Sequence, residues 1–253
     1  MIKKMIKWLL ITVFWIALWW ITATYIVRQE LLLPSPLQVL QRLRELMQEK
    51  DFYITTLTSL LRIFIGILIA MILGVVCGIL TAHISLLREL LSPILTIIKS
   101  TPVASFIILA LVWINRSKLP IFIALLMVLP IIWTNVEQGI RQIDPKLVEM
   151  AHVYRFSRRK RLFHITIPSV LPYFVAACRA SLGLAWKAGI AAEVLSTPQR
   201  SIGKELFEAK TFMETTDLFA WTVTVILLSI CMEKIFFLFL RLLLRNTHMG
   251  GVS

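Results

Sequence analysis

The feature of this sequence that most constrains its fold is a succession of long apolar stretches separated by charged segments. A helix crosses the hydrocarbon layer of a membrane with about 20 apolar residues. Stretches of this length lie at 8–27, 58–81, 119–139, 169–192 and 218–240. With 58% hydrophobic residues and a mean hydropathy of +0.82, the chain has more apolar side chains than the core of a water-soluble domain needs. The sequence therefore predicts an integral membrane protein.

A sixth apolar stretch, 88–114, contains a proline that interrupts it. The part that follows Pro102 is too short to cross a membrane by itself. The preceding run LLSPILTIIKS must then contribute a turn or lie as an oblique helix that is broken around Pro102. With this stretch included, we predict an all-α membrane protein with six transmembrane helices in one domain, residues 1–253.

The first stretch, 8–27, follows three lysines, so it is either a signal peptide or a retained anchor. Its apolar part is longer than a typical signal core, and the sequence TYIVRQELLLP offers no small-residue cleavage pattern. We therefore expect this segment to be a retained membrane anchor.

The distribution of charge predicts the orientation. Basic residues collect in cytoplasmic loops, and a cytoplasmic N-terminus places the basic segment 141–161 and both chain termini on that side. The opposite segments, 28–57 and 194–216, carry mixed charges. The excess of 27 Lys and Arg over 14 Asp and Glu fits this distribution. It does not fit a nucleic-acid-binding surface, because no basic stripe is interleaved with aromatic residues on a soluble fold.

The run PSPLQVLQRLRELMQEKDF precedes the second span and has the pattern of an amphipathic helix. Its apolar residues share one helical stripe: Leu37, Val39, Leu40, Leu43 and Leu46. We interpret it as a short helix on the external surface. An ordinary connecting helix with one solvated face would show the same pattern.

The most unusual polar segment is the loop between the fourth and fifth spans. Residues 141–161 carry seven basic and two acidic side chains. Asp144 followed by Pro145 is a favourable helix start, and Ser157 is a plausible cap for a second short helix. We expect two short helices with a corner between them. A loop that only anchors the topology would need the charges but neither the helical pattern nor the acidic start.

The run DPKLVEMAHVYRFSRRKRLFHITIPSVLP resembles the cytoplasmic signature loop of ATP-binding-cassette (ABC) importer permeases. Glu149 and Ala151 match its EAA element, and Ile165, Ile167 and Pro168 match its hydrophobic close. Further runs, LLPSPLQVLQRL, KSTPVASFIILALVW, WKAGIAAEVLS and SIGKELFEAK, are similar to permeases for nitrate, sulfonates and taurine. The resemblance covers about 220 residues in the same order.

The resemblance implies a type I importer permease fold in a bacterial cytoplasmic membrane, with a coupling-helix loop at 141–166. It also implies the partners: a second copy of the permease, two ATPase subunits that bind ATP and Mg, and an external substrate-binding protein. The residues expected to couple the permease to the ATPase are Glu149, Ala151, Tyr154, Arg155, Phe156 and Ser157. The chain itself has no GxxxxGK[ST] loop, so we expect ATP hydrolysis on a partner chain and no cofactor bound here.

Two positions depart from the family pattern. Met150 replaces the middle alanine of EAA, and Arg155 stands where a glycine is expected. A corner that needs a positive φ would be strained at an arginine. Either the turn geometry differs in this chain, or the helix continues further than usual.

Ionisable groups inside spans are functional candidates because burying charge is costly. On a continuous fifth helix, Arg179, Trp186 and Glu193 share one face, and Lys187 is turned away by roughly a quarter turn. We favour Lys187 and Glu193 as residues of the translocation pathway. The alternative is that both residues lie at the outer membrane interface.

Ser100, Thr101 and Pro102 complete the pathway candidates, as a helix break whose backbone groups line a polar cavity. The three cysteines lie inside apolar runs without ligand spacing, so we expect no metal site and no catalytic residue in this chain. Two other classes of function remain possible. A secondary transporter would normally show repeated halves and more acidic residues in its spans. A membrane-embedded enzyme would need converging catalytic groups.

Overall fold

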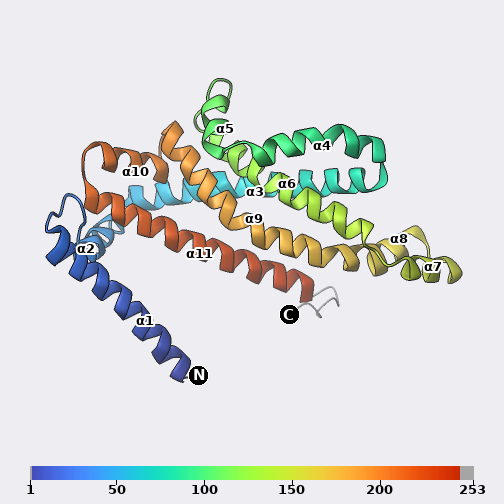
Figure 1. Cartoon of the computed structure of the whole chain (residues 1–253), viewed down its shortest axis with the longest axis horizontal. Coiled ribbons are helices and arrows are strands. Elements are labelled where there is room, and N and C mark those ends of the chain that lie inside the picture. Colours follow the sequence, from blue (N-terminus) through green and yellow to red (C-terminus); the bar gives the residue numbers. More distant parts are fainter. Residues whose placement is uncertain (1, 246–253) are drawn as a thin grey trace.

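The computed structural model describes residues 2–245, and this part of the chain contains helices and turns but no strand. Figure 1 shows most of the long helices running roughly along one direction. Five helices are long and apolar enough to cross a membrane, and a bent pair of shorter helices would make a sixth crossing. The prediction of an all-α membrane protein is confirmed.

In chain order the helices are α1 (Ile2–Ile21), η1 (Thr22–Val27), α2 (Pro36–Leu46), α3 (Lys50–His83), α4 (Ser85–Ser100), α5 (Val103–Ala110), α6 (Leu119–Arg141), α7 (Pro145–Val153), α8 (Arg158–Arg161), η2 (Leu162–Thr166), α9 (Ile167–Ser196), α10 (Ile202–Thr211) and α11 (Thr215–Arg245), where η marks a π-helical turn.

Several helices extend beyond the apolar stretches that predict them. Helix α3 begins eight residues before the predicted span 58–81, and α9 and α11 exceed the spans 169–192 and 218–240 at both ends. Hydrophobicity measures the length of chain that suits lipid, whereas a helix continues for as long as its backbone hydrogen bonds do. The apolar stretches therefore underestimate the helix lengths.

The predicted third span, 88–114, is not one continuous helix. Its two parts, α4 and α5, meet at an angle of 104° with the break at Thr101 and Pro102. Thr101 is extended, with ψ 130°, as expected for a residue before proline. Residues 111–114 lie beyond α5 in turns. The break at Pro102 is confirmed, and the helical part ends earlier than predicted.

The centre of the fold is the packing of α6 between α3 and α9. Helices α3 and α6 make the most extensive contact within the described chain, followed by α6 and α9. Small residues recur every four positions along α3, at Gly66, Ala70, Gly74 and Gly78, and all four are buried. A Cβ added to Gly74 would lie 2.8 Å from the Cβ of Ile132 on α6. These small residues let the two helix backbones approach closely.

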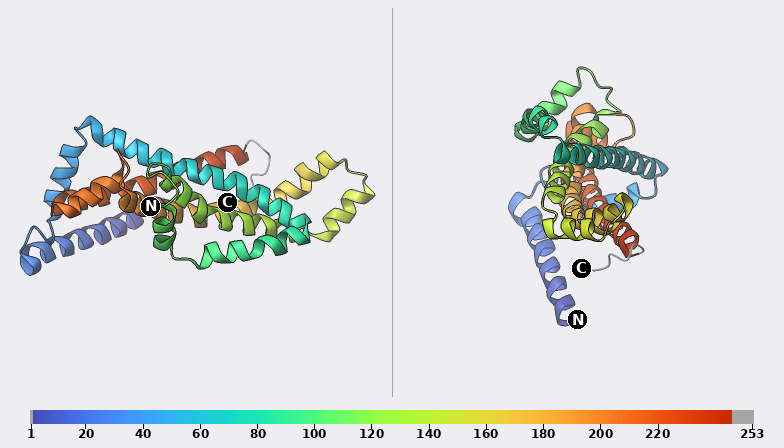
Figure 2. Two further views of the ribbon diagram at one scale, coloured as in Figure 1. Left: turned by 90° about the horizontal axis from the view of Figure 1, so that it is seen from above. Right: turned by 90° about the vertical axis from the view of Figure 1, so that its right-hand side faces the viewer.

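The two ends of the molecule differ. Figure 2 shows α7 and α8 projecting at one end, while α2, α10 and the turn after α1 lie at the other. Helix α1 diverges from the bundle (Figure 1) and packs at its far end, where Trp19 stacks on Phe219 of α11 with ring centroids 5.8 Å apart. Helices α7 and α8 thus lie at the opposite end of the long axis from α2 and α10.

Helix α2 begins at a capping box in which the side chains of Ser35 and Gln38 bond to each other's backbone N–H groups. Of the predicted apolar stripe, Val39 and Leu46 are buried, but Leu37 and Leu40 are more than 60% exposed. The predicted helix is confirmed, and Leu37 and Leu40 of its apolar stripe are not covered by the core of this chain.

Arg42 and Asp217 tie α2 to the start of α11. The guanidinium donates to both carboxylate oxygens of Asp217, at 2.6 and 2.9 Å. This paired hydrogen bond raises the pKa of Arg42 above its already high ordinary value. Arg42 therefore stays charged, and its paired hydrogen bonds to Asp217 hold the two helices together at this end of the molecule.

Candidate functional site

The loop at 141–166 has the two capped helices that its sequence predicts. Asp144 Oδ1 accepts a hydrogen bond from the backbone N–H of Lys146 at 2.9 Å and starts α7. Ser157 Oγ accepts from the N–H of Lys160 at 3.3 Å and starts α8. Both caps satisfy N–H groups that a helix start leaves free. The loop is therefore an ordered helical hairpin.

Arg155 adopts the left-handed conformation, with φ 50°, at the end of α7. Its N–H donates to His152 O at 3.0 Å, and the N–H of Phe156 donates to Ala151 O at 2.8 Å. This pair of bonds is the Schellman ending of a helix, in which glycine usually takes the left-handed position. Both expectations for Arg155 are wrong: the corner keeps the geometry that glycine would give, and the helix does not continue.

The hairpin is joined rigidly to α9. Residues Arg158–Ser196 form one continuous helical stretch through α8, η2 and α9. The hydroxyl of Tyr173 on α9 donates to the side-chain oxygen of Gln142, just after α6. Ala151 and Ile165 are buried. Helix α8 of the hairpin therefore continues into α9 without an intervening loop.

The outer surface of the hairpin is hollowed. The hollow is lined by Val148, Glu149, Ala151, His152, Val153, Phe156 and Arg161. Glu149 is exposed and has no hydrogen bond or ion pair with any described residue. Tyr154 is 72% exposed, and Lys160 Nζ lies 4.5 Å from the ring centroid of Phe156. The hollow thus offers a free carboxylate beside exposed apolar side chains.

Helix α9 also carries the pathway candidate Lys187. Lys187 is exposed, whereas the neighbouring Trp186 is buried with its Nε1 donating to Val225 O of α11. The face that the rest of the chain leaves uncovered runs along the helix through Pro172, Ala176, Ala180, Leu184, Lys187, Ala191 and Leu195. Lys187 is the cation at the centre of this otherwise largely apolar face.

Glu193, on the opposite side of α9, is fully buried. Its Oε2 accepts hydrogen bonds from Ser59 Oγ of α3 at 2.7 Å and from the N–H of Gly203 of α10 at 3.2 Å. Its Oε1 lies 3.6 Å from the guanidinium of Arg62. Ser59 Oγ also accepts from the N–H of Ile202 at 2.9 Å. The carboxylate therefore joins α3, α9 and the first turn of α10.

The helix break contains the remaining candidates. Ser100 Oγ donates to Thr96 O at 2.8 Å, and Thr101 Oγ1 donates to Ile97 O at 2.7 Å. These hydroxyls satisfy carbonyl groups at the end of α4, and Pro102 then turns the chain into α5. The break is a satisfied helix end rather than an unwound segment.

The chain was compared with known protein families and curated proteins. The family described as binding-protein-dependent transport system inner membrane component matches residues 66–248, more than half of the chain. The chain belongs to this family.

Curated permeases align with most of this permease. A bicarbonate transport system permease protein of Synechococcus elongatus is 27% identical over 226 residues, covering 85% of this chain and 81% of that protein. A taurine transport system permease protein of Escherichia coli is 26% identical and covers 86% and 81%. A nitrate import permease protein of Synechococcus elongatus is 32% identical over 58% of this chain and 53% of that protein. Together with its apolar helices, this family membership makes the permease a multi-pass membrane protein.

The permease also holds a polar cluster that the sequence analysis missed. Glu137 near the end of α6 lies 3.3 Å from Arg88 of α4 and 3.6 Å from Arg141. Its other oxygen accepts from Thr81 Oγ1 at 3.0 Å, and Thr81 accepts from Trp133 Nε1 at 2.9 Å. The sequence carries a signal for it, because Glu137 lies inside the predicted span 119–139 and an ionisable residue within a span is a functional candidate.

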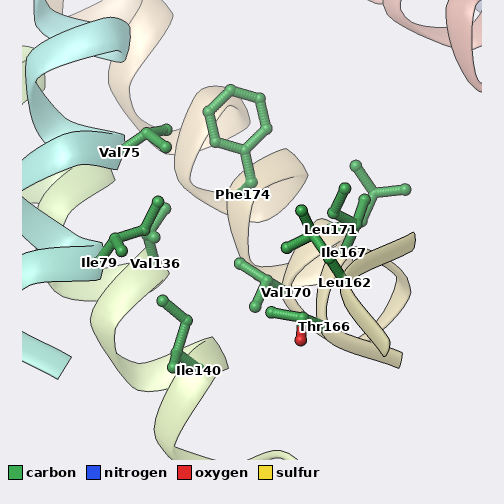
Figure 3. Close-up of a pocket in the computed structure, with 10 residues that line it drawn as sticks. All are labelled: Val75, Ile79, Val136, Ile140, Leu162, Thr166, Ile167, Val170, Leu171 and Phe174. Atoms are coloured by element: carbon green, nitrogen blue, oxygen red, sulfur yellow. The ribbon is translucent and has the colours of Figure 1, made fainter. Parts of the chain in front are cut away.

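An apolar groove lies beside the hairpin and contains none of these polar groups. Figure 3 shows the side chains around it, which come from four elements: Val75 and Ile79 of α3, Val136 and Ile140 of α6, Leu162 and Thr166 of η2, and Ile167, Val170, Leu171 and Phe174 of α9. Only Thr166 brings a polar side chain to the lining. The groove has no ionisable group and is unsuited to a charged solute.

Proposed function

We propose that this protein is the translocation subunit of an ABC importer and that a separate ATPase drives it through the 141–166 hairpin. Family membership and the continuous helix from the hairpin into α9 support this function. A motor outside the membrane can move a pathway only through a stiff element that carries its displacement. The sequence has no phosphate-binding GxxxxGK[ST] loop, so ATP and Mg are assigned to the partner.

The hairpin supplies the docking surface for the ATPase. The proposed coupling residues are Glu149, Ala151, Tyr154, Arg155, Phe156 and Ser157. Glu149 offers its carboxylate to a complementary groove, and Ala151 allows close approach of the partner backbone. Arg155 and Ser157 set the corner between α7 and α8, which fixes the direction in which α8 enters α9.

The uncovered face of α9 supports a homodimer, in which each of the two hairpins would dock one ATPase. A lysine in a membrane span faces a polar cavity or another protein rather than lipid, since a charge in hydrocarbon is costly. We propose that this face meets the same face of a second copy and that Lys187 lies in the pathway between them. Ser100, Thr101 and Pro102 shape the pathway wall, and Glu193 holds its outer end together from inside the subunit.

The relatives indicate the class of solute. Permeases for bicarbonate, taurine and nitrate carry small solutes with an anionic group. We propose a small polar or anionic organic solute or oxyanion, delivered by an extracytoplasmic binding protein, as the transported substrate. The basic hairpin supports a cytoplasmic location for the N- and C-termini. A C-terminal tag that an impermeant reagent reaches in intact cells would contradict this orientation.

Co-expression with the ATPase encoded beside it tests the function. We expect a stable complex whose ATP hydrolysis and solute uptake into proteoliposomes are both inhibited by vanadate. A secondary transporter would instead take up solute along an ion gradient without ATP. Uptake of that kind by the permease alone would overturn the proposal.

A further inference from the structure

Helix α4 is amphipathic, but its apolar side is exposed and its polar side lines a cleft in the protein, which is the reverse of a surface helix in a soluble protein. Its apolar residues Leu86, Leu90, Ile94 and Ile97 are 50–65% exposed. Four of its polar residues, Arg88, Ser92, Thr96 and Lys99, lie within one arc of the helix and line a cleft against α6. A membrane helix with this arrangement faces lipid with its apolar side and a polar space with the other.

The cleft is small and bounded by three helices. It is lined by Thr81 of α3, by Arg88, Ser92, Leu95, Thr96 and Lys99 of α4, and by Trp133, Thr134 and Glu137 of α6. Its volume is about 210 Å³. Because about 10–15 Å³ of such space is enough to hold one water molecule, the cleft has room for a small anion with part of its hydration shell.

The charges in the cleft do not cancel. Glu137 is its only acidic lining residue and already contacts two arginines, Arg88 at 3.3 Å and Arg141 at 3.6 Å. Lys99 has no ion-pair or hydrogen-bond partner among the described residues. A cation left unpaired between membrane helices marks a site for an opposite charge. The excess positive charge therefore lies at the Lys99 end of the cleft.

We propose that the α4–α6 cleft binds a small oxyanion, with Lys99 as its main counter-charge and Arg88 at the other end. This site rests on the proposed function and places a binding step of the transported anion between α4 and α6.

Charge-selective labelling of a cysteine in the cleft tests this site without requiring transport. The permease–ATPase complex carries Thr96→Cys in a background with Cys77→Ser, Cys178→Ala and Cys231→Ser, in proteoliposomes of phosphatidylcholine. The measured quantity is the ratio of the labelling rates of an anionic and a cationic methanethiosulfonate. Ser92→Cys is the second reporter, in case Thr96→Cys fails to assemble.

We expect Lys99→Gln to lower this ratio by about tenfold, because a unit charge a few ångströms away acts strongly on charged reagents at low dielectric. Lys99→Arg should preserve the ratio, and Lys118→Gln, which removes an exposed lysine outside the cleft, should not change it. Nitrate, bicarbonate or ethanesulfonate should slow labelling by a neutral reagent, and gluconate should not.

An unchanged ratio in Lys99→Gln, or no protection by the three small anions, overturns the site. Protection that arises only when phosphatidylglycerol is added also overturns it, because the cleft would then hold a lipid headgroup. The two proposals fail separately. Vanadate-sensitive uptake without cleft protection removes this site alone, whereas protection without ATP-dependent uptake removes the proposed function.

Discussion

Glu193 of α9 and Ser59 of α3 are joined by a buried hydrogen bond of 2.7 Å across 134 positions of sequence. The same carboxylate accepts from the N–H of Gly203, where α10 begins. A carboxylate at a helix start satisfies free N–H groups and the positive end of the helix dipole. The position of α10 thus depends on one acidic side chain that belongs to another helix.

Removing this carboxylate should destabilise the permease. Glu193→Ala leaves the Ser59 hydroxyl, the Gly203 N–H and the Arg62 charge without their partner, at an expected cost of about 3–5 kcal/mol. Glu193→Gln keeps an acceptor oxygen and should cost less. Thermal unfolding of the purified complex measures both, and an Ala variant that melts with the wild type would contradict the bracing role.

A side chain at Gly74 should force α3 and α6 apart. Its Cβ would lie 2.8 Å from that of Ile132, so Gly74→Val overpacks a tight contact at an expected cost of about 1–3 kcal/mol or more. Ile72→Val is the control, since Ile72 is 66% exposed on the same helix and should be tolerated. Size-exclusion chromatography after heating compares the two, and equal recovery would argue against close packing.

Replacing Arg155 by glycine should stabilise the hairpin. A non-glycine residue in the left-handed conformation destabilises the folded state by about 1–2 kcal/mol. Glycine removes this strain, but its greater conformational freedom in the unfolded chain offsets about 0.5–1 kcal/mol of the gain. We expect a net gain of up to about 1 kcal/mol, read as a higher melting temperature. Arg158→Gly, in the first turn of α8, should lower it, so a fall in both variants would refute the assignment.

Glu149 should matter more for ATPase binding than the basic cluster does. Losing a carboxylate that pairs with a complementary groove leaves partner groups unpaired, at about 2–5 kcal/mol. Exposed basic residues are screened and contribute about 1 kcal/mol or less each. Glu149→Ala should therefore release or uncouple the ATPase, while Arg159→Ala and Lys160→Ala retain it in pull-down and ATP hydrolysis assays. The reverse pattern would assign docking to the basic residues.

Lys187→Met should slow uptake by about tenfold at low substrate concentration, because it removes the positive charge from the uncovered face of α9 while keeping much of the volume. Lys210→Met, an exposed lysine on α10, should transport as the wild type does. Uptake into proteoliposomes containing the ATPase and the binding protein gives the comparison. An unchanged rate in Lys187→Met would place this lysine at the membrane interface.

Local chemistry explains why parts of the fold were predictable. Asp144 and Ser157 cap helices through bonds to residues two or three positions away, and Pro102 breaks its helix by the geometry of its own backbone. Arg155 shows the limit of local reasoning. The sequence indicated the strain of a positive φ, but the bonds from Arg155 and Phe156 to α7 keep that conformation.

The sequence by itself determined that the chain is a helical membrane protein, where the two hairpin helices start, where the third span breaks, and that a basic hairpin separates two spans. Apolar length, capping and proline geometry act over a few residues, so they can be recognised without the fold. The tertiary structure decided which polar groups are paired. Glu193 contacts Ser59 and Glu137 contacts Arg88 only because α9 meets α3 and α4 folds back on α6. Burial and pairing depend on residues far apart in the chain, and hydrophobic periodicity carries no information about which of them meet.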